Sequence, residues 1–199
     1  MSQPLILASG SAIRTKLLAQ AGVDHVVEVP RIDEDMIKQS LLSENASPRD
    51  IADTLAEMKA RKVSEKNPGT LVLGCDQVLD HKGKLLSKPV NREDALEQLQ
   101  LLRGDRHSLL SAAVICEDGQ PIWRHVGQVR LRMRDASDVY LEDYLLRNWG
   151  SIRHTVGCYK LEEEGVRLFS NIEGDYFNVL GMPLLELLNH LTLRGDLAT

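Results

Sequence analysis

The chain has 199 residues, of which 43% are hydrophobic and 27% charged, a composition typical of a water-soluble globular protein. Its 24 Lys and Arg are outnumbered by 29 Asp and Glu, and the net charge of −5 argues against a general nucleic-acid binder. No apolar run suits a membrane span or a signal peptide, and the three cysteines are scattered. We therefore expect a cytoplasmic protein with no disulfide framework and no membrane or nucleic-acid partner.

The first candidate site lies where a short apolar strand, Leu5 to Ala8, runs through Ser9 and Gly10 into a helix. Gly10 allows a tight turn and the close approach of a ligand. Ser11 is a good N-cap, so the first helical amides, together with Arg14, would form a phosphate-binding helix N-terminus. The alternative is an ordinary strand–helix turn with a solvated arginine.

Strand and helix patterns interleave along the whole chain. Helices are predicted from Ala12 to Gly22, Ser47 to Asn67, Asn91 to Gly104, Ser137 to Trp149 and from Pro183 onward. Further strands are predicted at His25–Val29, Thr70–Gly74, Ser108–Cys116 and Ile122–Met133, near Tyr159, and at Val166–Ile172 and Phe177–Leu180. Because some neighbouring strands form hairpins, we expect a mixed α/β sheet flanked by helices. No linker divides the chain, which predicts one domain over residues 1–199 with two lobes around a central cleft.

Two groups of acidic residues are candidates for chemistry. Asp76 follows the strand Thr70–Gly74, and the carboxyl end of a strand is where open α/β sheets bind ligands. There it could accept a proton from water or hold a metal ion. The run Asp33, Glu34, Asp35 could supply a second carboxylate for a divalent cation. The alternatives are a turn-starting Asp and a solvated acidic loop.

Two lysines and one further acid complete the set. Lys88, stiffened by the following proline, and Lys59 are candidate phosphate contacts. Lys59 lies on a helix rich in Lys and Arg, so an exposed side chain is the alternative. Glu162 could contact a nucleobase edge, or it could be one of three surface acids.

Read in order, these segments resemble the Maf-like nucleotide pyrophosphatases over nearly the whole chain. The motifs that carry the resemblance are Leu7-Ala8-Ser9-Gly10-Ser11-Ala12-Ile13-Arg14, Asp33-Glu34, Leu55-Ala56-Glu57-Met58-Lys59-Ala60, Gly74-Cys75-Asp76-Gln77-Val78, Lys88-Pro89, Leu102-Arg103-Gly104-Asp105-Arg106-His107, Val156-Gly157-Cys158-Tyr159 and the segment from Ile172 to Leu184.

The resemblance implies a mixed α/β fold, a homodimer, and hydrolysis of a nucleoside triphosphate to the monophosphate and pyrophosphate with Mg²⁺ or Mn²⁺. Asp76 matches the family's proton acceptor. The positions that match its phosphate, metal or catalytic residues are Ser9, Arg14, Glu34, Lys59 and Lys88. Asp76 and Glu34 are the metal ligands that we expect.

Three positions that differ within the family bear on the base. Much of the family has Arg, Thr and Gln where this chain has Ile13, Gln77 and Glu162. Gln77 and Glu162 are similar to the branch that prefers 7-methyl-GTP, although that branch carries Trp at position 13. A carboxylate suits guanine because it accepts from the N–H donors of the base. The alternatives are a dTTP or UTP pyrophosphatase and a nucleotide-binding or partner-binding module with incidental catalysis.

Overall fold

The computed structural model describes residues 4–198, in which seven strands form one mixed sheet. The strands are β1 (Leu5–Ala8), β2 (His25–Val27), β3 (Val72–His81), β4 (Lys84–Leu86), β5 (Arg106–Glu117), β6 (Gln120–Met133) and β7 (Phe169–Glu173). The helices are α1 (Ala12–Gln20), α2 (Glu34–Ser43), α3 (Pro48–Ser64), α4 (Arg92–Leu102), α5 (Asp138–Ile152), α6 (Tyr176–Val179), α7 (Leu184–Arg194) and the 3-10 turns η1 (Val156–Cys158) and η2 (Glu164–Leu168).

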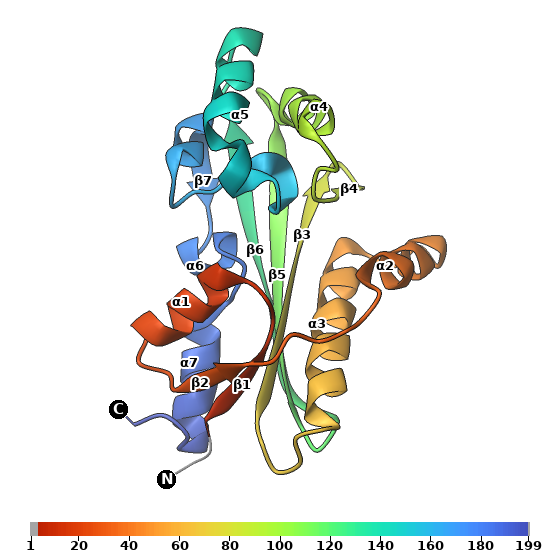
Figure 1. Ribbon diagram of the computed structural model, residues 1–199, viewed down its shortest axis with the longest axis vertical. Coiled ribbons are helices and arrows are strands. Elements are labelled where there is room, and N and C mark those ends of the chain that lie inside the picture. Colours follow the sequence, from red (N-terminus) through yellow and green to blue (C-terminus); the bar gives the residue numbers. More distant parts are fainter. Residues whose placement is uncertain (1–3, 199) are drawn as a thin grey trace.

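The sheet has the order β2-β1-β3-β5-β6-β7, with β4 added to β3. β1 runs parallel to β2 and β3, whereas every later pairing is antiparallel. The long hairpin of β5 and β6 extends through both halves of the molecule, so the two halves share one sheet (Figure 1). The predicted mixed α/β sheet flanked by helices is confirmed.

Helices cover the sheet differently in its two halves. In the half that contains β1, α3 packs on one face, and α1 and α7 pack on the other (Figure 1). In the other half, α4, α5 and the chain around η1 cover one face and enclose a separate apolar cluster. Within residues 4–198, no helix is both long and apolar enough to cross a membrane.

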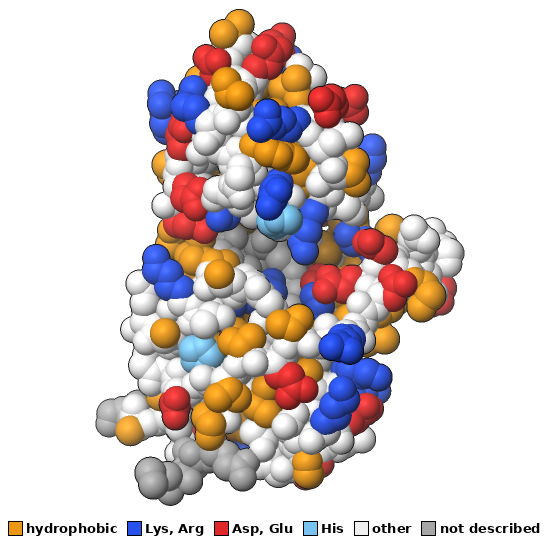
Figure 2. All heavy atoms as spheres, viewed as in Figure 1, with side chains coloured by type: hydrophobic (Ala, Val, Ile, Leu, Met, Phe, Trp, Pro, Cys, Tyr) orange, Lys and Arg blue, Asp and Glu red, His pale blue; other side chains and the backbone are white. Residues whose placement is uncertain are grey.

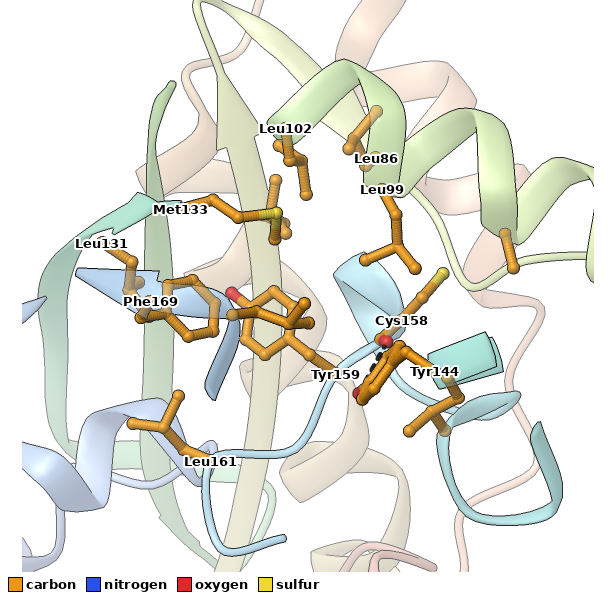
Figure 3. Close-up of a cluster of buried hydrophobic side chains, with 14 of the residues drawn as sticks. Leu86, Leu99, Leu102, Leu131, Met133, Tyr144, Cys158, Tyr159, Leu161 and Phe169 are labelled. Atoms are coloured by element: carbon orange, nitrogen blue, oxygen red, sulfur yellow. Dashed lines mark hydrogen bonds between the residues drawn. The ribbon is translucent and has the colours of Figure 1, made fainter. Parts of the chain in front are cut away.

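Two aromatic rings form the centre of this second cluster. Tyr159 and Phe169 meet edge to face with their ring centroids 4.7 Å apart, surrounded by leucines of α4 and β6 (Figure 3). The Tyr144 hydroxyl donates to the carbonyl of Cys158 at 3.3 Å, which ties α5 to η1. The cluster therefore fixes the segment after α5 against the sheet.

Asp76 lies within β3 and not at its end, so the predicted strand Thr70–Gly74 is too short. β3 continues to His81 because β5 pairs with it as far as Asp80. On the other edge, the ladder with β1 stops at Gly74 and the ladder with β4 starts at Leu79. No described strand pairs with residues 75–78 on that edge, and we call this interval the sheet gap.

Three other strand predictions are wrong in part or entirely. The chain before Tyr159 cannot extend, because Gly157 and Cys158 both have positive φ, 76° and 60°. The apolar run Phe177–Leu180 is mostly α6, because Asp175 caps this turn by accepting from the Asn178 amide. Of Val166–Ile172, only the part from Phe169 is a strand. The prediction that some neighbouring strands form hairpins is confirmed by β3 with β4 and by β5 with β6.

Helix α3 approaches β3 closely because residue 74 has no side chain. A Cβ on Gly74 would overlap the carbonyl oxygen of Ala56 and lie 2.7 Å from the amide nitrogen of Ala60. Ala52, Ala56 and Ala60 give α3 a small-residue face that suits this approach. The helix and strand are therefore in backbone contact beside Asp76.

We expect Gly74→Ala to lower the free energy of unfolding by about 1–3 kcal/mol, because the added methyl overpacks the α3–β3 contact. Urea denaturation measures the change. The matched control is Gly150→Ala in α5, where a Cβ meets no atom within 4 Å. Alanine there should stabilise by about 0.5–1 kcal/mol through helix propensity. Equal stability of the two variants would contradict the close packing.

Candidate active site

A buried ion pair lies at the sheet gap. The Nζ atom of Lys59, on α3, donates to Oδ1 of Asp76, on β3, at 2.7 Å, and the two side chains are only 8% and 9% exposed. Glu34 Oε1 lies 3.0 Å from the same Nζ atom. The possibility that Lys59 is an exposed surface lysine is wrong, because α3 turns it toward β3. One ammonium group therefore joins two carboxylates that are far apart in the sequence.

Glu34 is the first residue of α2 and lies at the open side of this pair. Asp33 caps the helix by accepting from the Met36 amide at 3.0 Å, which fixes where α2 begins. Partial burial opposes ionisation of Glu34, but the positive charges of Lys59, Lys88 and Arg14 outweigh it and lower its pKa. The carboxyl group is therefore ionised at neutral pH.

Arg14 does not extend into solvent, as the alternative interpretation of the first helix required. It is buried, and its guanidinium donates to the carbonyl of Gly181 at 2.8 Å, to the carbonyl of Cys75 at 3.0 Å and to Ser9 Oγ at 3.1 Å. Cys75 is the first residue of β3 beyond the β1 ladder. Arg14 therefore takes a carbonyl that lacks a strand partner and brings its charge to the sheet gap.

The amides at the start of α1 remain available. Ser11 is the N-cap with extended backbone, but its side chain makes no capping hydrogen bond. The first helical hydrogen bond runs from the Thr15 amide to the Ser11 carbonyl, at 3.2 Å. Gly10 has no positive φ, and a Cβ there would make only ordinary contacts with Val29. The turn therefore does not use the conformational freedom of Gly10, and the close approach of a ligand to Gly10 stays a prediction.

Lys88 follows β4 in an exposed loop. It makes no hydrogen bond or ion pair with the described residues, but its charge contributes to lowering the pKa of Glu34. It therefore lies within electrostatic reach of the carboxylates with its ammonium group unengaged. Figure 2 shows Lys, Arg, Asp and Glu side chains gathered beside the hollow at the middle of the molecule.

The three predicted specificity residues have different surroundings. Gln77 lies in the sheet gap, where its amide nitrogen contacts Ser111 and α6. Glu162 is exposed and makes no hydrogen bond or ion pair with the described residues. The pKa of Tyr176 in α6 is raised mainly by burial and, to a smaller extent, by the charge of Glu162. Ile13 is partly buried against the core cluster of α1 and α7. The adjacent acids Glu163 and Glu164 are engaged by Ser151 and Arg147.

Sequence reasoning missed three contributors to the site, two of which are backbone carbonyls in or just after the segment predicted as the strand Phe177–Leu180. The carbonyl of Gly181 receives Arg14, and the carbonyl of Asn178 receives both Ser111 and Gln77. The Asn178 side chain fills the space left by Gly127 on β6. No sequence signal distinguishes Ser111 within its apolar strand. Backbone carbonyls carry no side-chain signature, so their use here is visible only in the fold.

The two carboxylates suit a divalent cation shared with a substrate. No group of three or more His, Cys, Asp or Glu converges as a metal site within residues 4–198. Mg²⁺, however, is commonly held by one or two carboxylates together with waters and substrate phosphates. Asp76 and Glu34 both contact the ammonium group of Lys59, and they form such a pair of oxygen donors. The residues therefore fit a cation that binds with its phosphorylated substrate.

The structure is a mixed α/β sheet in which Lys59 bridges the carboxylates of Asp76 and Glu34, and in which Arg14 of α1 contacts the carbonyl of the residue before Asp76. The family model described as Maf-like protein matches residues 4–193. The chain is 74% identical over 197 residues, 99% of both chains, to the nucleoside triphosphate pyrophosphatase of Roseobacter denitrificans. It is 68% identical over the full length of both chains to that of Ruegeria pomeroyi, and 50% identical over 194 residues, 98% of this chain and 97% of the relative, to that of Caulobacter vibrioides. This chain belongs to the Maf-like family.

Lys59→Met should lower the free energy of unfolding by about 3–5 kcal/mol, because it leaves the Asp76 carboxylate buried and unpaired. The double variant Lys59→Met/Asp76→Leu should recover most of that loss, since an apolar pair of similar volume removes the uncompensated charge. Chemical denaturation of both variants tests this. A double variant no more stable than Lys59→Met would show that the loss comes from packing instead.

Lys88→Met should raise the pKa of Glu34 toward its ordinary value of 4.5, because one of the charges that lowers it is removed. The lowered pKa means that Glu34 stabilises the fold above pH 4.5, a contribution lost as the pH falls through the folded-state pKa. Carboxyl NMR titration measures the shift. Lys66→Met, at an exposed lysine that does not act on Glu34, is the control, and an equal shift there would contradict the assignment.

Proposed function

We propose that this chain is a nucleoside triphosphate pyrophosphatase that uses water to cleave the α–β phosphoanhydride, releasing a nucleoside monophosphate and pyrophosphate. The carrying observation is the buried Lys59–Asp76 pair beside the free N-terminus of α1. The names of the relatives at 68–74% identity support it. A pure binding module would not need a buried charged pair at its ligand.

The triphosphate lies, in this proposal, between α1 and the carboxylates. The first amides of α1 and the positive end of its dipole face the phosphates. The guanidinium of Arg14, which is held by Ser9 and two backbone carbonyls, adds positive charge to the phosphate site. Lys88, exposed and unengaged, contacts the phosphates from the opposite side of the hollow. These cations stabilise the charge that develops as the α-phosphorus is attacked.

Asp76 accepts the proton of the attacking water. Lys59 occupies Oδ1, and no described residue binds Oδ2, so Oδ2 is the atom that receives the proton. Glu34 holds the outer side of Lys59 and fixes the ammonium between the two acids. A divalent cation, Mg²⁺ or Mn²⁺, held by Asp76 and Glu34 would supply charge neutralisation for the triphosphate.

The same proposal extends to the preferred base, the cellular compartment, the domain and the oligomeric state. A guanine-type base such as 7-methylguanine is favoured by Gln77 and by the unengaged carboxylate of Glu162, and pyrimidine triphosphates are the alternative in a substrate panel. Ile13 belongs partly to the core and supplies no aromatic stacking surface. Three buried free cysteines suit a reducing, cytoplasmic setting. We also propose one domain over residues 1–199, acting as a homodimer, which analytical ultracentrifugation can measure.

Asp76→Asn should lower kcat for pyrophosphate release by about 10²- to 10⁴-fold with nucleotide binding retained, because the general base is lost. Turnover in H₂¹⁸O should place the label in the monophosphate and not in pyrophosphate. Asp80→Asn is the matched control, since Asp80 lies on the same strand and its side chain accepts from the Gly83 amide in the β3–β4 turn. If Asp76→Asn released pyrophosphate at the same low rate as the unsubstituted protein, the binding module would be favoured.

A further inference from the structure

Gln77 lies on the open edge of the sheet. The Leu71 carbonyl accepts from the Ile6 amide of β1, so odd-numbered residues of this strand direct their peptide groups toward that edge. The register between β3 and β5 is continuous from Val72 to Asp80, so Gln77 keeps the same direction. At Gln77, β1 has ended and β4 has not begun, and the residue therefore borders the sheet gap.

The orientation of the Gln77 side-chain amide is fixed by its neighbours. Nε2 lies 2.9 Å from the Asn178 carbonyl, 3.0 Å from the Val179 carbonyl and 2.9 Å from Ser111 Oγ, so its two N–H donors are shared among three acceptors. The Ser111 hydroxyl donates its own proton to the Asn178 carbonyl at 2.6 Å, so it can only accept from Gln77. A flipped amide would place its oxygen against two backbone carbonyl oxygens, neither of which can donate, and this excludes the other orientation.

The carbonyl oxygen of Gln77 is the atom that remains. No described residue donates a hydrogen bond to Oε1, and Oε1 is not among the buried polar atoms that lack a partner. It therefore reaches solvent from a half-buried side chain whose donor end is fully engaged. At this position the site offers an acceptor and no side-chain donor.

We propose that Ser111 and the carbonyls of α6 hold Gln77 as a fixed acceptor, so that the enzyme selects bases that present an N–H at this point. This inference rests on the proposed pyrophosphatase function. Keto bases qualify, since uracil carries N3–H and guanine carries N1–H, whereas cytosine and adenine present an unprotonated ring nitrogen there. Ser111 acts through Gln77 and is a positioning residue.

The test compares nucleotides that differ at that ring nitrogen. We expect kcat/KM to be at least about tenfold higher for UTP than for CTP and for ITP than for ATP, the discrimination expected of one well-oriented hydrogen bond. Equal values within both pairs, with pyrophosphate still released, would overturn the inference alone. If none of the four, nor GTP or 7-methyl-GTP, yields pyrophosphate, the proposed function itself fails.

Variants separate orientation from packing. Gln77→Met removes donor and acceptor at similar volume, and both ratios should fall to about one. Ser111→Ala should reduce both ratios severalfold with kcat for the best substrate retained, because only the α6 carbonyls then hold the amide, and Ser111→Thr should restore them. Gln128→Met, at an exposed glutamine on β6, should leave the ratios unchanged. Ratios unaltered in Gln77→Met, or lowered equally in Gln128→Met, would overturn the proposal.

Discussion

The site depends on one electrostatic constraint: Asp76 and Lys59 can be buried only together. An isolated ionised carboxylate in the interior would cost several kcal/mol, so the ammonium must lie within hydrogen-bond distance. That distance is available because Gly74 and the alanines of α3 let helix and strand meet at backbone contact. The ion pair therefore depends on packing as well as on charge. Glu34, on α2, adds a second carboxylate contact to Lys59.

The sheet gap gives this pair access to a substrate. Had β1 continued past Gly74, or had β4 begun earlier, a strand would lie over the edge where Asp76 and Gln77 stand. Arg14 occupies the first carbonyl of the interrupted edge. The segment from α6 to Gly181 serves both ends of the site, because its carbonyls hold Gln77 on one side and Arg14 on the other. The proposed phosphate contact and the proposed base contact are therefore both held by this segment.

Much of the fold follows from local pattern, and the failures have physical reasons. The long alternating segments of β5 and β6 and the capped helices α3, α4 and α5 were predictable because period and caps agree there. Asp76 was placed at a strand end because polar residues usually end a buried strand, yet β5 extends the ladder beyond it. Lys59 gave no sign of burial, since its partners are 17 and 25 residues away. Ser111 was missed because its importance comes from neighbours that only the fold supplies.

The most direct test is a crystal structure of the Asp76→Asn variant with Mg²⁺ and an α,β-methylene nucleoside triphosphate. The account predicts that the phosphates lie between the N-terminus of α1 and Lys88, with the α-phosphorus facing residue 76 and the base against Oε1 of Gln77. A triphosphate bound elsewhere, such as in the surface hollow lined by Arg134 and Arg167, would contradict it.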